Sequence, residues 1–265
     1  MMRALWTAAS GMGAQQLQMD VISNNLANVN TNGFKKSRVD FQDLLYEHLR
    51  HAGSVDSAGQ QLPLGLEVGH GVRPADTQKI FTTGNATVTN NPLDLMINGD
   101  GFFQVTLPNG QIQYTRDGSF KTDANGRVVT ADGYPMEPAV TIPSTATGIV
   151  VLTNGQVQIT LPNGQPNQVV GQIELARVAN PAGMESEGQN LFSTTDASGE
   201  VQVGTPGVDA IGSIQQGALE GSNVATVDEM VNLITTQRAY ESNTKVVTAS
   251  DLMMQQANTM HSTGV

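Results

Sequence analysis

Cysteine is absent from the 265-residue chain, and basic residues are scarce. The lack of cysteine excludes disulfides, zinc–cysteine sites and thiol catalysis. Lys and Arg number 13 against 24 Asp and Glu, so the net charge is −11 and no basic patch suits nucleic acid. No apolar run approaches the roughly 18 residues that a membrane-spanning helix needs. The apolar start, residues 1–10, continues directly into a helical pattern, so we interpret it as mature structure without a cleaved signal peptide.

Residue patterns typical of catalysis and metal binding are missing as well. The four histidines are His48, His51, His70 and His261. None has a second ligand at metal-binding spacing on a periodic element. The DANG segment at Asp123 lacks the calcium-loop spacing, Gly99-Asp100-Gly101 lacks the third glycine of a dinucleotide fingerprint, and no G-x-S-x-G elbow occurs. We therefore expect no enzyme activity, no cofactor and no metal site.

A long helical pattern is present at the N-terminus and repeats every seven residues. Its expected contact positions are Leu5, Met12, Met19, Ile22, Leu26 and Val29. Between Arg3 and Lys35 the only charged residue is Asp20, and amides occupy much of the remaining surface. The pattern stops at residues 30–33, where Asn and Gly tolerate the left-handed geometry that ends a helix.

A second helical pattern lies near the C-terminus. Thr226 and Glu229 form a capping box, and no Gly or Pro interrupts the chain from Val227 to Met260. The expected contact positions are Met230, Leu233, Tyr240, Val247 and Met254. One such stripe is typical of an ordinary core helix. Two of them at opposite termini, both poor in charge, favour a helical pair that is covered by protein on more than one side and assembles into a polymer.

The region between the helices predicts an inserted β domain. Residues 35–50 suit a short helical or extended arm, and residues 51–65 suit a loop. From Val68 onward, alternating runs are separated by turn pairs. These pairs are Asn109-Gly110, Asp117-Gly118, Asn125-Gly126, Asp132-Gly133, Asn154-Gly155 and Asn163-Gly164. The predicted class is α+β: paired long, coiled-coil-like terminal α-helices (residues 1–33 with 222–265), an extended arm or loop connector (34–67) and a mainly antiparallel β domain (68–221).

Several segments resemble a known family. ASGM at Ala9, MDVISNNLANVNTNGFK at Met19 and MVNLITTQRAYESNTKV at Met230 resemble the paired terminal signatures of bacterial flagellar axial proteins, the rod, hook and hook-associated subunits. The segments at 62–85, 91–105 and 114–129 are similar to those of the distal rod subunits within that family. The resemblance covers nearly the whole chain, in the same order.

The resemblance implies a structural subunit that polymerises into the distal rod of the flagellar basal body, a hollow rigid drive shaft that transmits torque from motor to hook. Implied partners are further copies of the chain, proximal rod proteins, hook protein, the outer-membrane and peptidoglycan ring (bushing) proteins and the flagellar type III export apparatus. The implied location is the periplasm-spanning rod. The helical contact positions become subunit-interface residues. The segment from Tyr46 to Gly65, with Leu62, Pro63 and Leu64, becomes a rod-stiffening segment wedged between subunits.

Two alternatives remain open from the residues alone. One is a paralogous proximal rod or hook subunit, because these share the terminal signatures. The other, from a different class, is an extracellular carbohydrate- or surface-binding β domain with helical oligomerisation tails. Regular tubes or fibres in electron micrographs would favour the axial subunit, whereas a compact oligomer with glycan affinity would favour the binding protein.

Overall fold

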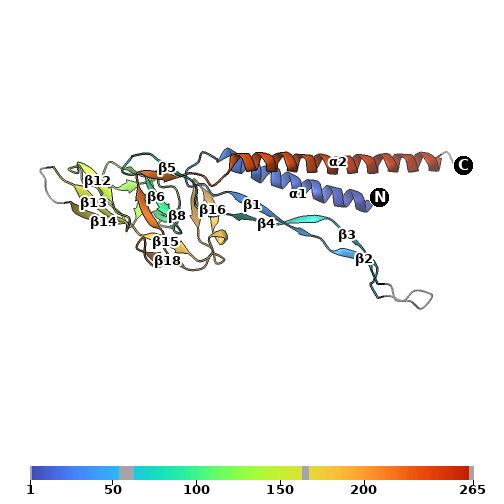
Figure 1. The fold of residues 1–265 in the computed structure, drawn as a ribbon, viewed down its shortest axis with the longest axis horizontal. Helices are drawn as coiled ribbons and strands as arrows, with labels where there is room; N and C mark the ends of the chain where they lie inside the picture. The colour runs from blue at the N-terminus through green and yellow to red at the C-terminus, as the bar shows by residue number, and fades with distance from the viewer. Residues whose placement is uncertain (1, 54–62, 163–166, 263–265) are drawn as a thin grey trace. The chain divides into compact units, whose positions relative to one another are not determined.

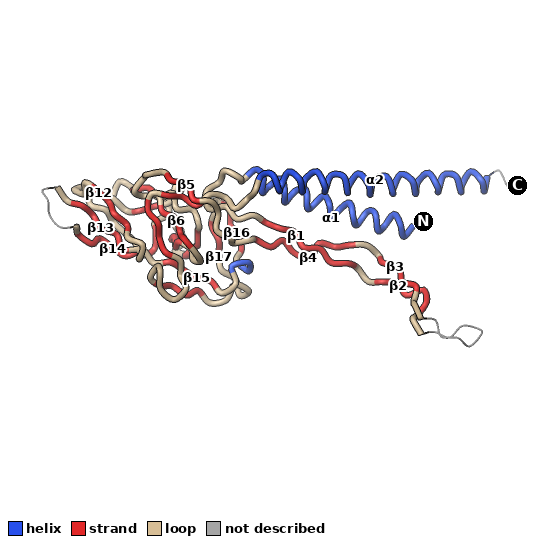
Figure 2. The backbone as a smooth tube through the Cα atoms, viewed as in Figure 1, coloured by secondary structure: helices blue, strands red, loops and turns tan. Residues whose placement is uncertain are grey.

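The structure, a computed structural model, describes residues 2–53, 63–162 and 167–262. The predicted α+β class is confirmed: in chain order, α1 (Met2–Ala27) precedes and α2 (Thr226–Ser262) follows a mainly antiparallel β region (Figures 1 and 2). The chain divides into two compact units. The first, which we call the helical unit, falls within Met1–Leu26, Ser37–Gln78 and Thr226–Val265. The second, the β unit, comprises Ala27–Lys36 and Lys79–Ala225.

The two helices of the helical unit lie side by side and run in opposite directions (Figure 1). The Thr244 hydroxyl donates to the Met12 sulfur at 3.7 Å. A side-chain carbon added to Gly11 would lie 3.0 Å from Nδ2 of Asn243, so glycine permits a close approach there. With 37 residues, α2 is about 56 Å long. It begins at Thr226, one residue before the start that the sequence predicted.

A two-stranded arm completes the helical unit. β1 (Ser37–Asp43) pairs with β4 (Val72–Lys79), and β2 (Tyr46–Arg50) pairs with β3 (Leu66–Gly69). In the second pair the strands are antiparallel, with Tyr46 opposite Gly69. Of the two alternatives for residues 35–50, the extended arm is therefore correct. The returning strand begins at Leu66, two residues before the predicted start of the β pattern.

The arm is bonded to α1 at three levels. Near the end of α1, the buried Asn25 side chain donates to the Ser37 carbonyl at 2.8 Å and accepts from the Ser37 amide at 2.9 Å. In the middle, the Ser10 hydroxyl accepts from the Val72 amide at 3.4 Å. Near the start, Arg3 and Glu47 form an exposed ion pair at 2.7 Å. These contacts give the first helix a partner within its own chain.

The β unit is built around a five-stranded antiparallel sheet in the order β11–β7–β8–β17–β16. Its strands are β7 (Phe103–Thr106), β8 (Ile112–Thr115), β11 (Met136–Glu137), β16 (Glu185–Gly188) and β17 (Leu191–Ser193). A second sheet contains β12 (Gly148–Val151), β13 (Gln156–Thr160) and β14 (Gln168–Gln172). The remaining pairs are β5 (Ala86–Val88) with β20 (Ala218–Glu220), β6 (Leu95–Asn98) with β19 (Ser213–Gln216), β9 (Lys121–Thr122) with β10 (Val128–Val129), and β15 (Leu175–Val178) with β18 (Val201–Gly204). A short 3₁₀ helix, η1, spans Pro181–Gly183.

Two apolar clusters form the core of the β unit. In the larger one, Phe103 and Phe120 pack edge to face with ring centroids 5.1 Å apart. In the smaller one, Phe102 and Phe192 pack together with Phe81 against them. Burial of these apolar side chains stabilises the β unit independently of any second subunit.

Most of the predicted turns are confirmed by their glycines. Four have the positive φ of a left-handed residue that follows a type I turn in a hairpin loop: Gly110, Gly126, Gly133 and Gly155. The Asp117-Gly118 prediction was wrong as a turn of this kind, since Gly118 lacks a positive φ and a side chain there would overlap the Leu95 carbonyl. Asn163-Gly164 lies outside the described residues.

Candidate assembly surfaces and a buried polar junction

Metal-binding clusters are not found among the residues that the structure describes: no group of three or more His, Asp or Glu side chains could hold an ion. Within the same residues, no helix has the length and apolar character that crossing a membrane would require. The features that stand out are the faces of the terminal helices, the arm, and a buried cluster of charges in the β unit.

The predicted contact positions at the N-terminus are largely covered in the subunit. Ile22 is buried, with 4% of its surface exposed. The others are half-buried: Leu5, Met12, Met19, Leu26 and Val29. Met12 contacts α2 of the same chain through Thr244. The heptad stripe of α1 therefore packs partly inside the subunit, and its contact with a neighbouring subunit stays a prediction.

The predicted contact positions on α2 divide into two groups. Leu233, Val247 and Met254 are half-buried, and Tyr240 is 36% exposed. Met230 is 51% exposed and lies on a different face, together with Val227, Val231 and Ile234. These four residues follow the i, i+3, i+4, i+7 spacing of one helix face, and each is at least half exposed. We call them the outer stripe. Only Met230 among them was predicted, although the same spacing was visible in the sequence.

The predicted stiffening segment lies on the arm. Tyr46, the first residue of β2, is 50% exposed, and Pro63 and Leu64 are also exposed. Gly65 is half-buried, and a side chain there would lie 2.8 Å from the Arg50 carbonyl, so the chain turns tightly at this point. Leu62 lies outside the described residues. The stiffening role stays a prediction.

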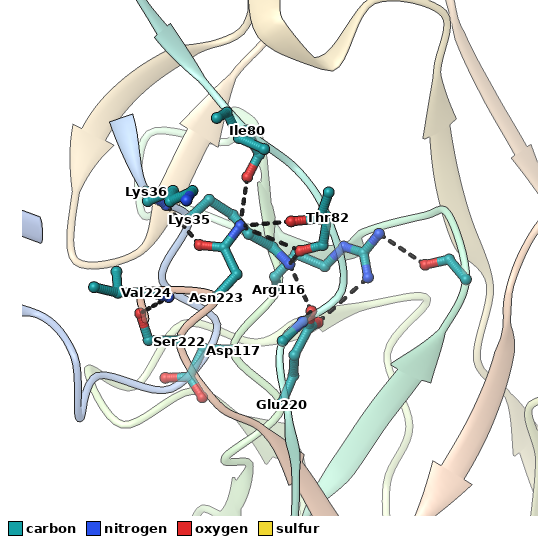
Figure 3. A network of polar contacts seen from close by, with 12 residues as sticks. Lys35, Lys36, Ile80, Thr82, Arg116, Asp117, Glu220, Ser222, Asn223 and Val224 are labelled. Atoms are coloured by element: carbon teal, nitrogen blue, oxygen red, sulfur yellow. Dashed lines mark hydrogen bonds and ion pairs between the residues drawn. The ribbon is translucent and has the colours of Figure 1, made fainter. Parts of the chain in front are cut away.

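The β unit also contains a buried cluster of charges that the sequence pattern did not predict (Figure 3). Lys35 follows the turn after α1, Arg116 follows β8, and Glu220 is the last residue of β20. The Lys35 Nζ donates to Glu220 Oε1 at 2.5 Å, and Arg116 donates to Glu220 Oε2 at 3.3 Å. Each of the three side chains is at most 2% exposed. The available signal was a lysine pair, Lys35 and Lys36, at the end of a stretch almost free of charge.

Backbone groups complete the hydrogen bonding of Lys35 and Glu220. Lys35 donates to the Thr82 carbonyl at 2.7 Å. Glu220 Oε1 accepts from the Gly84 amide at 3.0 Å, and the Glu220 carbonyl accepts from the Gly33 amide at 2.8 Å. A buried carboxylate is tolerated when several donors satisfy it, and Glu220 meets that condition.

Asn223 adds a neutral link beside the charges (Figure 3). Its Oδ1 accepts from the Lys36 amide at 2.8 Å. Its Nδ2 donates to the Ile80 carbonyl at 2.7 Å and to the Thr82 hydroxyl at 3.0 Å. We call Lys35, Arg116, Glu220 and Asn223 the polar junction.

Burial sets the electrostatics of the junction. Desolvation lowers the pKa of Lys35, and the attraction of Glu220 opposes this shift. The pKa of Arg116 is lowered for the same reason and is opposed by the same carboxylate. Two cations thus share one anion. Arg116 gains further partners in the Gly99 carbonyl at 2.9 Å and the Phe102 ring, whose centroid lies 5.2 Å from its guanidinium carbon.

Gly33 holds the turn that brings Lys35 into the junction, and it should not tolerate a side chain. Its φ is +67°, and a side-chain carbon would lie 2.6 Å from the Asp117 amide. Gly110 is a matched control, because its φ is +81° and nothing lies within 4 Å of an added carbon. Gly110→Ala should cost about 1 kcal/mol of backbone strain. Gly33→Ala should cost about 1–3 kcal/mol more through overlap with backbone atoms. Urea unfolding of the purified subunits measures both, and equal losses would contradict the packing at Gly33.

Comparison with known protein families gives three matches. Residues 5–35 match the model described as flagella basal body rod protein, and residues 96–159 match the flagellar hook protein FlgE/F/G D1 domain. Residues 215–260 match the C-terminal region of the flagellar basal body rod FlgEFG proteins. The first match covers most of α1 and the third covers most of α2, so the two terminal signatures meet in the helical unit.

Whole-chain relatives agree with these matches. The chain is 48% identical over 263 residues to the flagellar basal-body rod protein FlgG of Caulobacter vibrioides, covering 98% of this chain and all of the relative. It is 47% identical over 255 residues to FlgG of Buchnera aphidicola from Acyrthosiphon pisum, covering 96% and 98% of the two chains. FlgG of Borreliella burgdorferi is 46% identical over 262 residues, covering 98% and 99%.

Proposed function

The chain belongs to the FlgG family of flagellar basal-body rod proteins, and from this membership we propose how its parts build a shaft. It is the structural subunit of the distal rod, the rigid drive shaft that connects motor to hook. The observation that carries this function is the similarity over nearly the whole chain, with both terminal signatures present on α1 and α2. The protein assembles with other flagellar proteins in the basal body.

The finer partners and the route to the rod form the rest of the proposal. The subunit contacts copies of itself, proximal rod proteins at one end and hook protein at the other. The outer-membrane and peptidoglycan rings surround the rod, and the chain reaches this place through the type III export apparatus.

Two kinds of helix face support polymerisation. An open helical polymer requires heterologous interfaces, in which the surface that binds the next subunit differs from the surface that receives it. Leu233 and Val247 are half-buried within the subunit, and Thr244 on the same helix contacts α1. The outer stripe has no cover among the described residues and exposes Val227, Met230, Val231 and Ile234 to water. Covering these side chains on assembly would remove apolar surface from water and favour the polymer.

Electron microscopy of concentrated purified subunit tests this function against the binding-protein alternative. We expect straight, regular tubes or fibres. A compact oligomer with affinity for glycans would contradict the assignment.

Deleting residues 46–65 should leave polymerisation intact and give curved or more flexible shafts. The arm presents exposed apolar side chains at Leu64 and Leu66, which suit contact with a neighbouring subunit. A segment wedged between subunits blocks the sliding that curvature requires. Electron micrographs of isolated shafts measure the curvature. Changing Leu64 and Leu66 to Ser keeps the length of the arm and separates apolar contact from steric blocking. Straight shafts of unchanged stiffness after the deletion would refute the wedge.

A further inference from the structure

Every covalent connection between the helical unit and the β unit runs through one of three short segments of the β unit. These are residues 27–36, which follow α1 and lead into the arm, residues 79–84, where the arm returns, and residues 220–225, which lead into α2. All three segments are bonded to one another at the polar junction (Figure 3).

We propose that the polar junction is a force-transmitting clamp, which holds the three connecting segments at one point and passes torque between the terminal helices and the β unit. This role rests on the function as a rod subunit and adds to it the residues through which the load crosses each subunit.

Each side chain of the clamp joins different segments. Lys35, from the first segment, bonds to the Thr82 carbonyl in the second and to Glu220 in the third. Asn223, from the third, bonds to the Lys36 amide in the first and to Ile80 in the second. No connecting segment can therefore move along the β unit without breaking bonds to both of the others.

Arg116 and Lys79 connect the clamp to the five-stranded sheet. Arg116 directly follows β8 and holds Glu220 from the sheet side. Lys79 lies 5.4 Å from the centroid of the Phe34 ring and 5.7 Å from that of Phe192 in β17. The Lys79 cation thus connects residues 27–36 and 79–84 to β17, which lies next to β8 in the five-stranded sheet.

Charge and burial together suit this mechanical role. Buried ion pairs contribute little net stability compared with apolar packing of the same volume, but they restrict geometry. Apolar side chains tolerate repacking, whereas a hydrogen bond weakens steeply when its distance and angle change. With both carboxylate oxygens of Glu220 engaged and no exposed surface, water cannot replace the bonds gradually under load.

Two variants and one control test the clamp in the full-length chain. Glu220→Gln removes the shared anion and leaves Lys35 and Arg116 without a charge partner. Asn223→Ala leaves the charges in place and removes the side-chain hydrogen bonds to Lys36, Ile80 and Thr82. The fold tolerates it because Asn223 is only half-buried. Asp123→Asn is the control, since it breaks an exposed ion pair with Arg127 elsewhere in the β unit.

The first readout is amide hydrogen exchange in the folded subunit. The Gly84 amide in Glu220→Gln, which loses its carboxylate acceptor, and the Lys36 amide in Asn223→Ala, which loses its side-chain acceptor, should exchange about 10- to 100-fold faster. The amides of Phe102 and Ala176, which bond across the core, should exchange as before. Unchanged amide exchange rates in the connecting segments of both variants would overturn the proposed clamp. If Glu220→Gln does not fold, Asn223→Ala alone decides.

The second readout is the elastic twist of the assembled shaft, followed with a bead on the hook of a cell whose only copy carries the variant. The clamp predicts more twist at the same torque in Asn223→Ala and no change in Asp123→Asn. Faster exchange without added twist would overturn the mechanical role and leave a role in folding alone. Failure of the unmodified chain to form shafts would instead contradict the proposed function.

Discussion

Met230→Asp should leave the free subunit folded and abolish assembly of the shaft. Met230 is 51% exposed on α2, where a charged side chain stays hydrated, so the free energy of unfolding should change by less than about 0.5 kcal/mol. In the proposed assembly the outer stripe is covered, and a carboxylate buried there without a partner costs several kcal/mol at every subunit contact. Because the cost is repeated along the shaft, motility should be lost completely. Motility assays and electron microscopy of basal bodies measure the outcome.

Met230→Leu is the matched control, because it conserves the volume and apolar character of the side chain. Cells with this variant should swim normally. Normal shafts in Met230→Asp would mean that the outer stripe faces water in the rod, and the interface would have to lie elsewhere.

Ile22→Asp should destabilise the free subunit, before any assembly takes place. Ile22 is 4% exposed, so an aspartate at this position loses apolar burial and is desolvated without a partner. Such a change costs on the order of 3–5 kcal/mol. The two helices should separate or unfold while the β unit, whose core lies in other residues, keeps its structure. Circular dichroism should therefore show loss of helix and retention of the strand signal, and cells should form no distal shaft.

Ile22→Val removes one methylene and should cost only about 0.5–1.5 kcal/mol, with assembly retained. If Ile22→Asp retains full helix content, Ile22 is not packed as the structure shows. The contrast between Ile22→Asp and Met230→Asp separates contacts inside a subunit from contacts between subunits.

Features that depend on local chemistry could be predicted from the sequence. The second helix was expected from Val227 to Met260, and the structure gives Thr226–Ser262. Its extent depends on local signals that are visible in the residues: two acidic side chains in the first turn and no Gly or Pro until after Met260. The positive φ of Gly110 and Gly155 likewise follows from two adjacent residues in a hairpin.

The polar junction could not be predicted, because it pairs residues 185 positions apart. In sequence, Lys35 only closes the helical signature, and Glu220 lies in a glycine-rich return segment. Neither residue type indicates burial, since lysine and glutamate are usually exposed. Their burial results from the topology of the β unit, which brings the connecting segments together.

The surfaces that cover the helix stripes could not be predicted from the sequence either. A heptad repeat shows that a face is covered but not which chain covers it. Met12 and Met230 were both expected at a subunit interface. The structure places Met12 against α2 of its own chain and leaves Met230 half exposed.

Labelling the protein in isolated basal bodies tests most directly that it forms the distal shaft. The Asn109-Gly110 turn joins β7 to β8, is exposed, and has no neighbour within 4 Å of an added carbon on Gly110, so it can accept a short epitope. Cells that carry the tagged chain as their only copy should swim, and gold-labelled antibody should bind the shaft between the proximal rod and the hook once the rings are stripped away. Gold on the hook or on the proximal rod, or a complete shaft that carries no label, would contradict the assignment.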